Sequence, residues 1–142
     1  MKRFRWQLRK AGVIAVDTNI VVRLLTGDHP DQFQVSKRLF QANQVFISDT
    51  VILETAWVLR WAYKAGPQPV AEALHGLLGL PNVHFRNRTV LAKAVEWHES
   101  GLDFADALHL AQSNHCEQMA TFDKGFVNRA RDLTTCPVKM LS

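Results

Sequence analysis

Acidic residues in four separated segments are the side chains of this sequence whose type and spacing suggest chemistry. Asp17 and Asp123 each come directly after a short apolar run, Glu54 lies in a helical stretch after another such run, and Asp103 and Asp106 stand three residues apart. Two bare carboxylates about 4 Å apart repel by roughly 4 kcal/mol at an effective dielectric near 20. A small domain that gathers several of them therefore needs a compensating cation. Oxygen ligands without cysteine or paired histidine favour Mg²⁺ or Mn²⁺ over Zn²⁺.

Each aspartate also has a purely structural interpretation. Asp17, Asp103 and Asp123 are each placed to cap the N-terminus of a following helix, a position that aspartate favours. Asp106 fits the first turn of the helix that Asp103 would cap, where the helix dipole stabilises negative charge. Its only local partner with cationic character is His109, so we expect further positive charge to reach it from elsewhere in the fold.

Glu54 is harder to explain by local structure. It lies four residues after Thr50, whereas a capping box needs a spacing of three. Its neighbours on the same helical face include no basic residue that could form a local ion pair: Thr50, Val51, Trp57 and Val58. The apolar surroundings predict a partly buried carboxylate that needs a cation or hydrogen-bond donors from another segment.

Other polar and aromatic residues are assigned supporting or structural roles. Thr18, Asn19 and Thr121 are short polar residues beside the acids and could orient them or hold metal-bound water. Trp57 and Trp61, four residues apart, are interpreted as core or interface residues rather than as base-stacking platforms. The six histidines show no metal-ligand spacing and are interpreted as surface or packing residues.

The elements that must position the acids alternate between short apolar runs and helical stretches. Such alternation predicts an α/β fold with a parallel sheet of about five strands, at residues 13–16, 45–47, 83–85, 119–121 and 138–140. In open parallel sheets, ligands bind outside the carboxyl ends of the strands. Because the acids follow strands, we expect all four segments to converge on that edge.

Length and composition limit the remaining possibilities. A chain of 142 residues fits one domain, which we place at residues 12–142. The net charge of +4 arises from five Lys and Arg within the first ten residues, which leaves 12 against 13 Asp and Glu in the rest. Residues 1–11 are therefore expected to be a basic leader, either a solvated tail or an additional phosphate contact. Two cysteines and no apolar run long enough to cross a bilayer favour a cytoplasmic protein.

The acidic segments resemble those of PIN-domain ribonucleases, and among them the VapC toxins of toxin–antitoxin pairs. Residues 15–20 (AVDTNI) resemble the opening strand with its first acid and adjacent asparagine, and residues 48–55 (SDTVILET) resemble the second segment. Residues 103–111 (DFADALHLA) resemble the third, with Asp106 as the main ligand and Asp103 as an auxiliary one. Residues 121–123 (TFD) resemble the Thr-x-Asp of the fourth. The basic segment 2–10 ahead of the first strand differs from most such toxins.

The resemblance implies a three-layer α/β/α sandwich and a Mg²⁺- or Mn²⁺-dependent endoribonuclease. It also implies a homodimer and a cognate antitoxin that blocks the acidic groove. The expected reaction is hydrolysis of an RNA phosphodiester by a metal-activated water, with Asp17, Glu54, Asp106 and Asp123 as catalytic metal ligands. Two alternatives remain open at this point: phosphoryl transfer through an aspartyl nucleophile at Asp17, and a non-catalytic RNA- or protein-binding module.

Overall fold

The computed structural model describes residues 12–134 and 136–142 and has an α/β architecture with parallel strands, as predicted. The basic leader expected at residues 1–11 lies outside the described residues. The strands are β1 (Val13–Ala15), β2 (Gln44–Phe46), β3 (Val83–His84), β4 (Met119–Thr121) and β5 (Val138–Met140). The helices are α1 (Thr18–Thr26), α2 (Pro30–Ala42), α3 (Asp49–Trp57), α4 (Pro67–Leu78), α5 (Arg88–Glu99), α6 (Phe104–Gln112) and α7 (Lys124–Ala130), and a π-helical turn, η1 (Val58–Ala62), extends α3.

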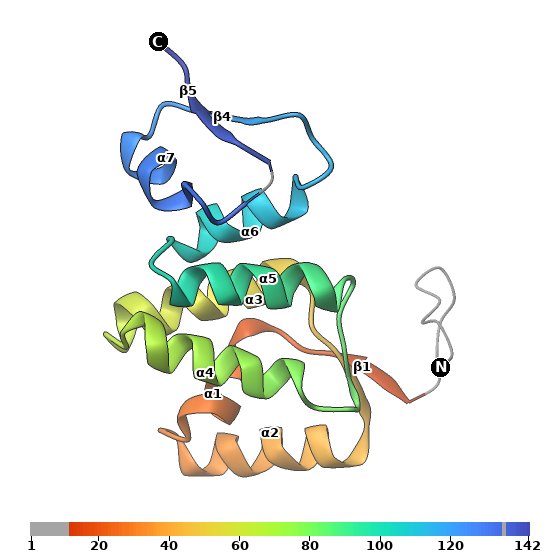
Figure 1. Ribbon diagram of the computed structural model, residues 1–142. Coiled ribbons are helices and arrows are strands. Elements are labelled where there is room, and N and C mark those ends of the chain that lie inside the picture. Colours follow the sequence, from red (N-terminus) through yellow and green to blue (C-terminus); the bar gives the residue numbers. More distant parts are fainter. Residues whose placement is uncertain (1–11, 135) are drawn as a thin grey trace.

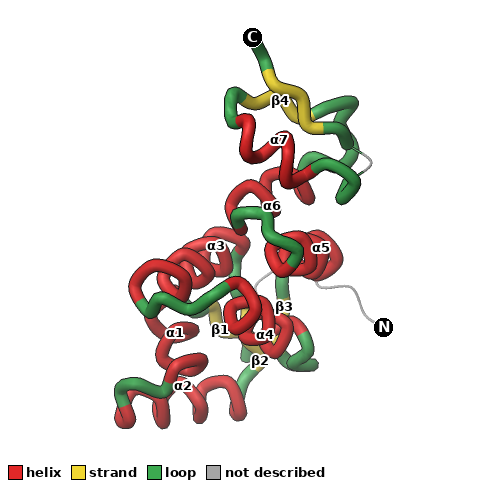
Figure 2. Tube along the Cα trace, turned by 60° about the vertical axis from the view of Figure 1, so that its left-hand side comes forward, coloured by secondary structure: helices red, strands yellow, loops and turns green. Residues whose placement is uncertain are grey.

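The strands form two parallel sheets. The first has the order β1-β2-β3, and the second pairs β4 with β5. Helix α2 lies on one side of β1 and helices α3 and α5 lie on the other, whereas β4, β5 and α7 lie beyond α6 (Figures 1 and 2). The five expected strands are thus present and parallel, but they are divided between two sheets. Apolar runs predict where strands occur but do not specify which strands are neighbours, so this division could not be read from the sequence.

Side-chain caps fix where several helices begin. The Ser48 side chain accepts the Val51 N–H at the start of α3, and Asn87 accepts the Val90 N–H at the start of α5. Gly27 ends α1 at φ 64°, a left-handed conformation that glycine adopts without strain. These boundaries place the start of α1 and the start of α3 immediately after β1 and β2.

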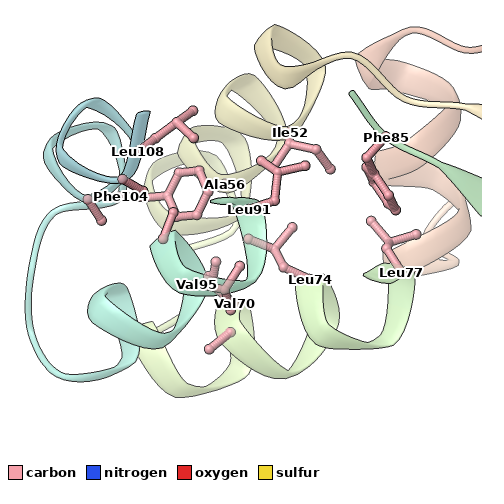
Figure 3. Packing of buried hydrophobic residues seen from close by; sticks show 14 of the residues in the cluster. Ile52, Ala56, Val70, Leu74, Leu77, Phe85, Leu91, Val95, Phe104 and Leu108 are labelled. Atoms are coloured by element: carbon pink, nitrogen blue, oxygen red, sulfur yellow. The ribbon is translucent and has the colours of Figure 1, made fainter. Parts of the chain in front are cut away.

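The apolar core is formed mainly where α3, α4, α5 and α6 pack together. Figure 3 shows side chains from these helices meeting one another and Phe85. Leu74 and Leu91 are each 1% exposed, so their burial contributes to the hydrophobic stabilisation that holds the helices in place. Within the described part of the chain, none of the helices combines the length and the apolar character needed to cross a membrane.

Candidate functional site

Thr18, the residue after Asp17, joins the start of α1 to Glu54. Asp17 follows β1 and caps α1, with its Oδ1 accepting the Ile20 N–H at 3.2 Å. Thr18, only 9% exposed, donates its hydroxyl to the Glu54 carboxylate on α3 in a hydrogen bond. The helices α1 and α3 pack directly against each other. This first acidic group (Asp17 and Glu54) therefore lies at the carboxyl ends of β1 and β2, where the sequence predicted it.

The expected partial burial of Glu54 is wrong, because the residue is exposed. The buried face of α3 is formed by Ile52, Thr55 and Ala56, and Glu54 lies outside that stripe. Its hydrogen-bond donor does come from another segment of the chain, as the sequence indicated.

A second acidic group comprises Asp103, Asp106 and Asp123. Asp103 caps α6 by accepting the Asp106 N–H at 3.3 Å, and Asp123 caps α7 by accepting the Phe126 N–H at 3.2 Å. Partial burial raises the pKa of Asp106 above its usual value, and the nearby carboxylates of Asp103 and Asp123 raise that pKa further. The three carboxylates thus repel one another, which is the electrostatic situation that a bound cation relieves.

The two acidic groups are separate in this structure. Helices α1, which Asp17 caps, and α3, which contains Glu54, lie beside the three-stranded sheet, whereas α7, which Asp123 caps, lies beyond α6 (Figures 1 and 2). Among the described residues, no three His, Cys, Asp or Glu side chains are grouped closely enough to hold one metal ion. The structure therefore brings the predicted ligands together in two sets rather than in one.

The donor chemistry of both groups nevertheless suits a hard divalent cation. Asp17 and Asp123 each use Oδ1, and Asp103 uses Oδ2, to cap a helix. In the described part of the chain, the second oxygen of each of these carboxylates has no hydrogen bond. Capping and metal ligation are therefore compatible roles for the same aspartate, and oxygen ligands of this kind fit Mg²⁺ or Mn²⁺.

Positive charge reaches the second acidic group from α7. Arg129 lowers the pKa of Asp106, as does His109, which partly opposes the effect of burial. The sequence predicted a cation from elsewhere in the fold without identifying Arg129. In a helix that begins at Lys124, Arg129 lies within about two turns of Asp123. This spacing is the sequence signal that could have identified Arg129 as the cation.

Arg23, the basic residue in the last turn of α1, contacts polar side chains of the protein itself. Its guanidinium lies 3.2 Å from the carboxylate of Asp28 and donates to Gln32 and Tyr63 at 2.7 and 3.1 Å. Lys124, the first residue of α7, is exposed beside Asp123.

The short polar residues beside the acids occupy different environments. The Thr121 hydroxyl accepts the Asp123 N–H at 3.0 Å, which fixes the turn between β4 and α7. Asn19 is exposed in the first turn of α1. Thr18 is the buried member of the three and contacts an acidic side chain directly.

Replacing Thr18 with Val is expected to lower the free energy of unfolding by about 1.5 kcal/mol, because a nearly isosteric side chain loses a hydrogen bond to a charged group. Urea denaturation measures this change. Thr89→Val, at an exposed threonine of α5, is the matched control and is expected to change stability by less than about 0.5 kcal/mol. Equal stability of Thr18→Val and the parent protein would show that this hydrogen bond contributes nothing to folding.

Comparison with known proteins identifies the family. A family model described as PIN domain matches residues 14–132, which is most of the chain and includes all five acidic residues. No curated protein and no solved structure is significantly similar to the chain. PIN domains are a family of metal-dependent nucleases. With its α/β fold and its acids at the ends of strands and the starts of helices, this protein belongs to the PIN domain family.

Proposed function

We propose that this protein is a Mg²⁺- or Mn²⁺-dependent endoribonuclease that hydrolyses RNA phosphodiester bonds. The observation that carries the proposal is the match to the PIN domain family over residues 14–132, which spans both acidic groups. The raised pKa of Asp106 and the neighbouring carboxylates support it, because such a group of acids is costly unless it holds a cation.

Asp17, Glu54, Asp106 and Asp123 are the proposed metal ligands, with Asp103 as an auxiliary ligand. A bound divalent cation would supply an acidified water and neutralise charge on the phosphoryl oxygens. Thr18 would orient the Glu54 carboxylate through its hydrogen bond. The cap that Asp123 forms on α7 would hold that carboxylate with one oxygen available.

This function requires the two acidic groups to come together. The two groups could meet at the edge of β1 that faces away from β2, because β1 has no other strand partner among the described residues. Ile14 of β1 is 38% exposed, and an unpaired strand edge is a template for further pairing. Strand β4 likewise pairs only with β5 within the described chain. Pairing of β4 with β1, within one chain or between two copies, would bring Asp123 toward Asp17.

The finer biological role rests on the resemblance to VapC toxins. We propose that the protein acts in the cytoplasm as the toxin of a toxin–antitoxin pair, forms a homodimer, and is inhibited by an antitoxin protein. The exposed Trp57 and Trp61 are compatible with an interface but do not define its partner.

Incubation of the purified protein with total RNA and Mn²⁺, with and without a chelator, tests the proposed function. Mapping of new RNA ends should reveal internal cuts that appear only without the chelator. Cleavage that persists in the chelator would contradict metal dependence. A phosphorylated Asp17 would favour the aspartyl-nucleophile alternative, and RNA binding without turnover would favour the binding module.

A further inference from the structure

A small pocket lies between the end of α3, the π-helical turn η1, and the start of α6. Its volume is about 70 Å³, enough for roughly two water molecules. Its lining combines aromatic, basic, acidic and apolar side chains: Trp57, Arg60, Trp61, His98, Asp103 and Phe104, with Leu53, Ala56 and Ala105. Asp103 belongs to the second acidic group, so the pocket adjoins the proposed catalytic residues.

The two tryptophans of the pocket are solvent-exposed. Trp57 is 60% exposed and Trp61 is 58% exposed, which excludes the core role considered for them from the sequence. The guanidinium of Arg60 lies 5.1 Å from the centroid of the Trp61 ring, and its Nη1 donates to the Ala65 carbonyl at 3.0 Å. A cation is therefore held over one aromatic ring, and most of the surface of both rings remains accessible.

His98 lines the pocket with a ring whose Nε2 is shielded from solvent. The side chain is 3% exposed, its Nδ1 lies 2.7 Å from the Leu102 carbonyl, and its ring packs edge-on against Phe104. Its Nε2 is buried and has no hydrogen-bond partner among the described residues. His98 therefore shapes the wall of the pocket, and the exposed rings of Trp57 and Trp61 are the surface that a ligand can reach.

We propose that this pocket is a base-stacking subsite for single-stranded RNA, an inference that rests on the proposed ribonuclease function. Exposed tryptophans accept a base of any sequence by stacking, and arginine adds attraction to the base and to the adjoining phosphate. The pocket is too small for a whole base, so the base lies over the exposed tryptophan rings beside it. Through Asp103, a base held here is placed beside Asp106 and positions the neighbouring phosphodiester.

Binding of a dye-labelled single-stranded RNA oligonucleotide, measured by fluorescence anisotropy without metal, tests this subsite. Trp57→Ala and Trp61→Ala are each expected to weaken binding by about 5- to 150-fold, the range that corresponds to losing one stacked base. Phenylalanine at either position should restore most of the affinity. Met140→Ala, which truncates a 50% exposed apolar side chain on β5, is the control and should leave affinity unchanged.

Two results would overturn the subsite. One is unchanged RNA affinity in both tryptophan variants. The other is a change from dimer to monomer in the tryptophan variants, detected by light scattering, that alone accounts for the lost affinity. This surface would then be a protein interface. Failure of the nuclease proposal looks different: RNA binding would depend on the tryptophans, but no Mn²⁺-dependent cleavage would occur. If the protein cleaves RNA but its RNA affinity is unchanged in both tryptophan variants, only the subsite is rejected.

Discussion

Asp106→Asn is expected to lose at least about 100-fold in Mn²⁺-dependent RNA cleavage and yet to unfold at a higher temperature than the parent protein when metal is absent. The cleavage loss follows from removing a ligand to a cation that stabilises transition-state charge by several kcal/mol. The gain in stability follows from the raised pKa of Asp106, since the folded state disfavours its charged form. A neutral amide of the same shape removes the repulsion from Asp103 and Asp123.

The same pKa shift predicts how stability varies with pH in the metal-free protein. Because the folded-state pKa of Asp106 is raised, its contribution favours folding below the unfolded-state value near 4. That contribution is lost as the pH rises through the folded-state pKa. The stability advantage of Asp106→Asn over the parent protein should therefore grow as the pH rises above about 4, because only the parent loses this contribution.

Thermal unfolding from pH 4 to pH 7 in the presence of a chelator measures both effects. Glu72→Gln, which neutralises an exposed acid on α4, is the matched control and should follow the parent curve. If Asp106→Asn were less stable than the parent protein at pH 7, the carboxylate would be making a favourable contact that outweighs its burial and its acidic neighbours.

Asp17→Asn is expected to reduce cleavage by a similar factor, about 100-fold or more, with the fold intact. Asparagine is as good an N-cap as aspartate, so the amide oxygen can still accept the Ile20 N–H at the start of α1. The free energy of unfolding should therefore stay within about 0.5 kcal/mol of the parent value. Cleavage rates on a defined RNA, together with urea denaturation, separate the two effects.

Asp132→Asn provides the control for this substitution. Asp132 adopts a φ of 71° at the end of the segment after α7, a conformation that asparagine tolerates. It lies outside both acidic groups, and its variant should cleave RNA at the parent rate. Parent-like cleavage by carefully purified Asp17→Asn protein would remove Asp17 from the active site.

The sequence predicts local elements well because they depend on local chemistry. The continuous apolar runs indicated all five strands, and the capping roles of Asp17, Asp103 and Asp123 follow from their positions before helical stretches. The grouping of the strands into two sheets depends on which edges pair, and short apolar runs hold no information on that. The exposure of Glu54 was missed because apolar neighbours along a helix do not reveal which face the helix buries.

The candidate site shows the same division between local and long-range information. The acid spacing predicted carboxylates near the ends of strands, and the structure places Asp17 after β1 and joins its neighbour Thr18 to Glu54. The contact of Thr18 with Glu54 joins residues 36 positions apart, so it depends on the packing of α1 against α3. The sequence does not reveal that Nε2 of His98 lacks a hydrogen-bond partner. A buried histidine whose two ring nitrogens are both hydrogen-bonded would look the same in the sequence.

The central proposal is that the two acidic groups act together on one metal site. Titration of the metal-free protein with Mn²⁺, followed by electron paramagnetic resonance or calorimetry, measures this directly in the parent protein, Asp17→Asn and Asp106→Asn. Loss of at least about tenfold in affinity in both variants is expected, since each removes a ligand from the same ion. Parent-like Mn²⁺ affinity in Asp17→Asn, with weakened binding in Asp106→Asn, would contradict a shared site and confine the metal to the second acidic group.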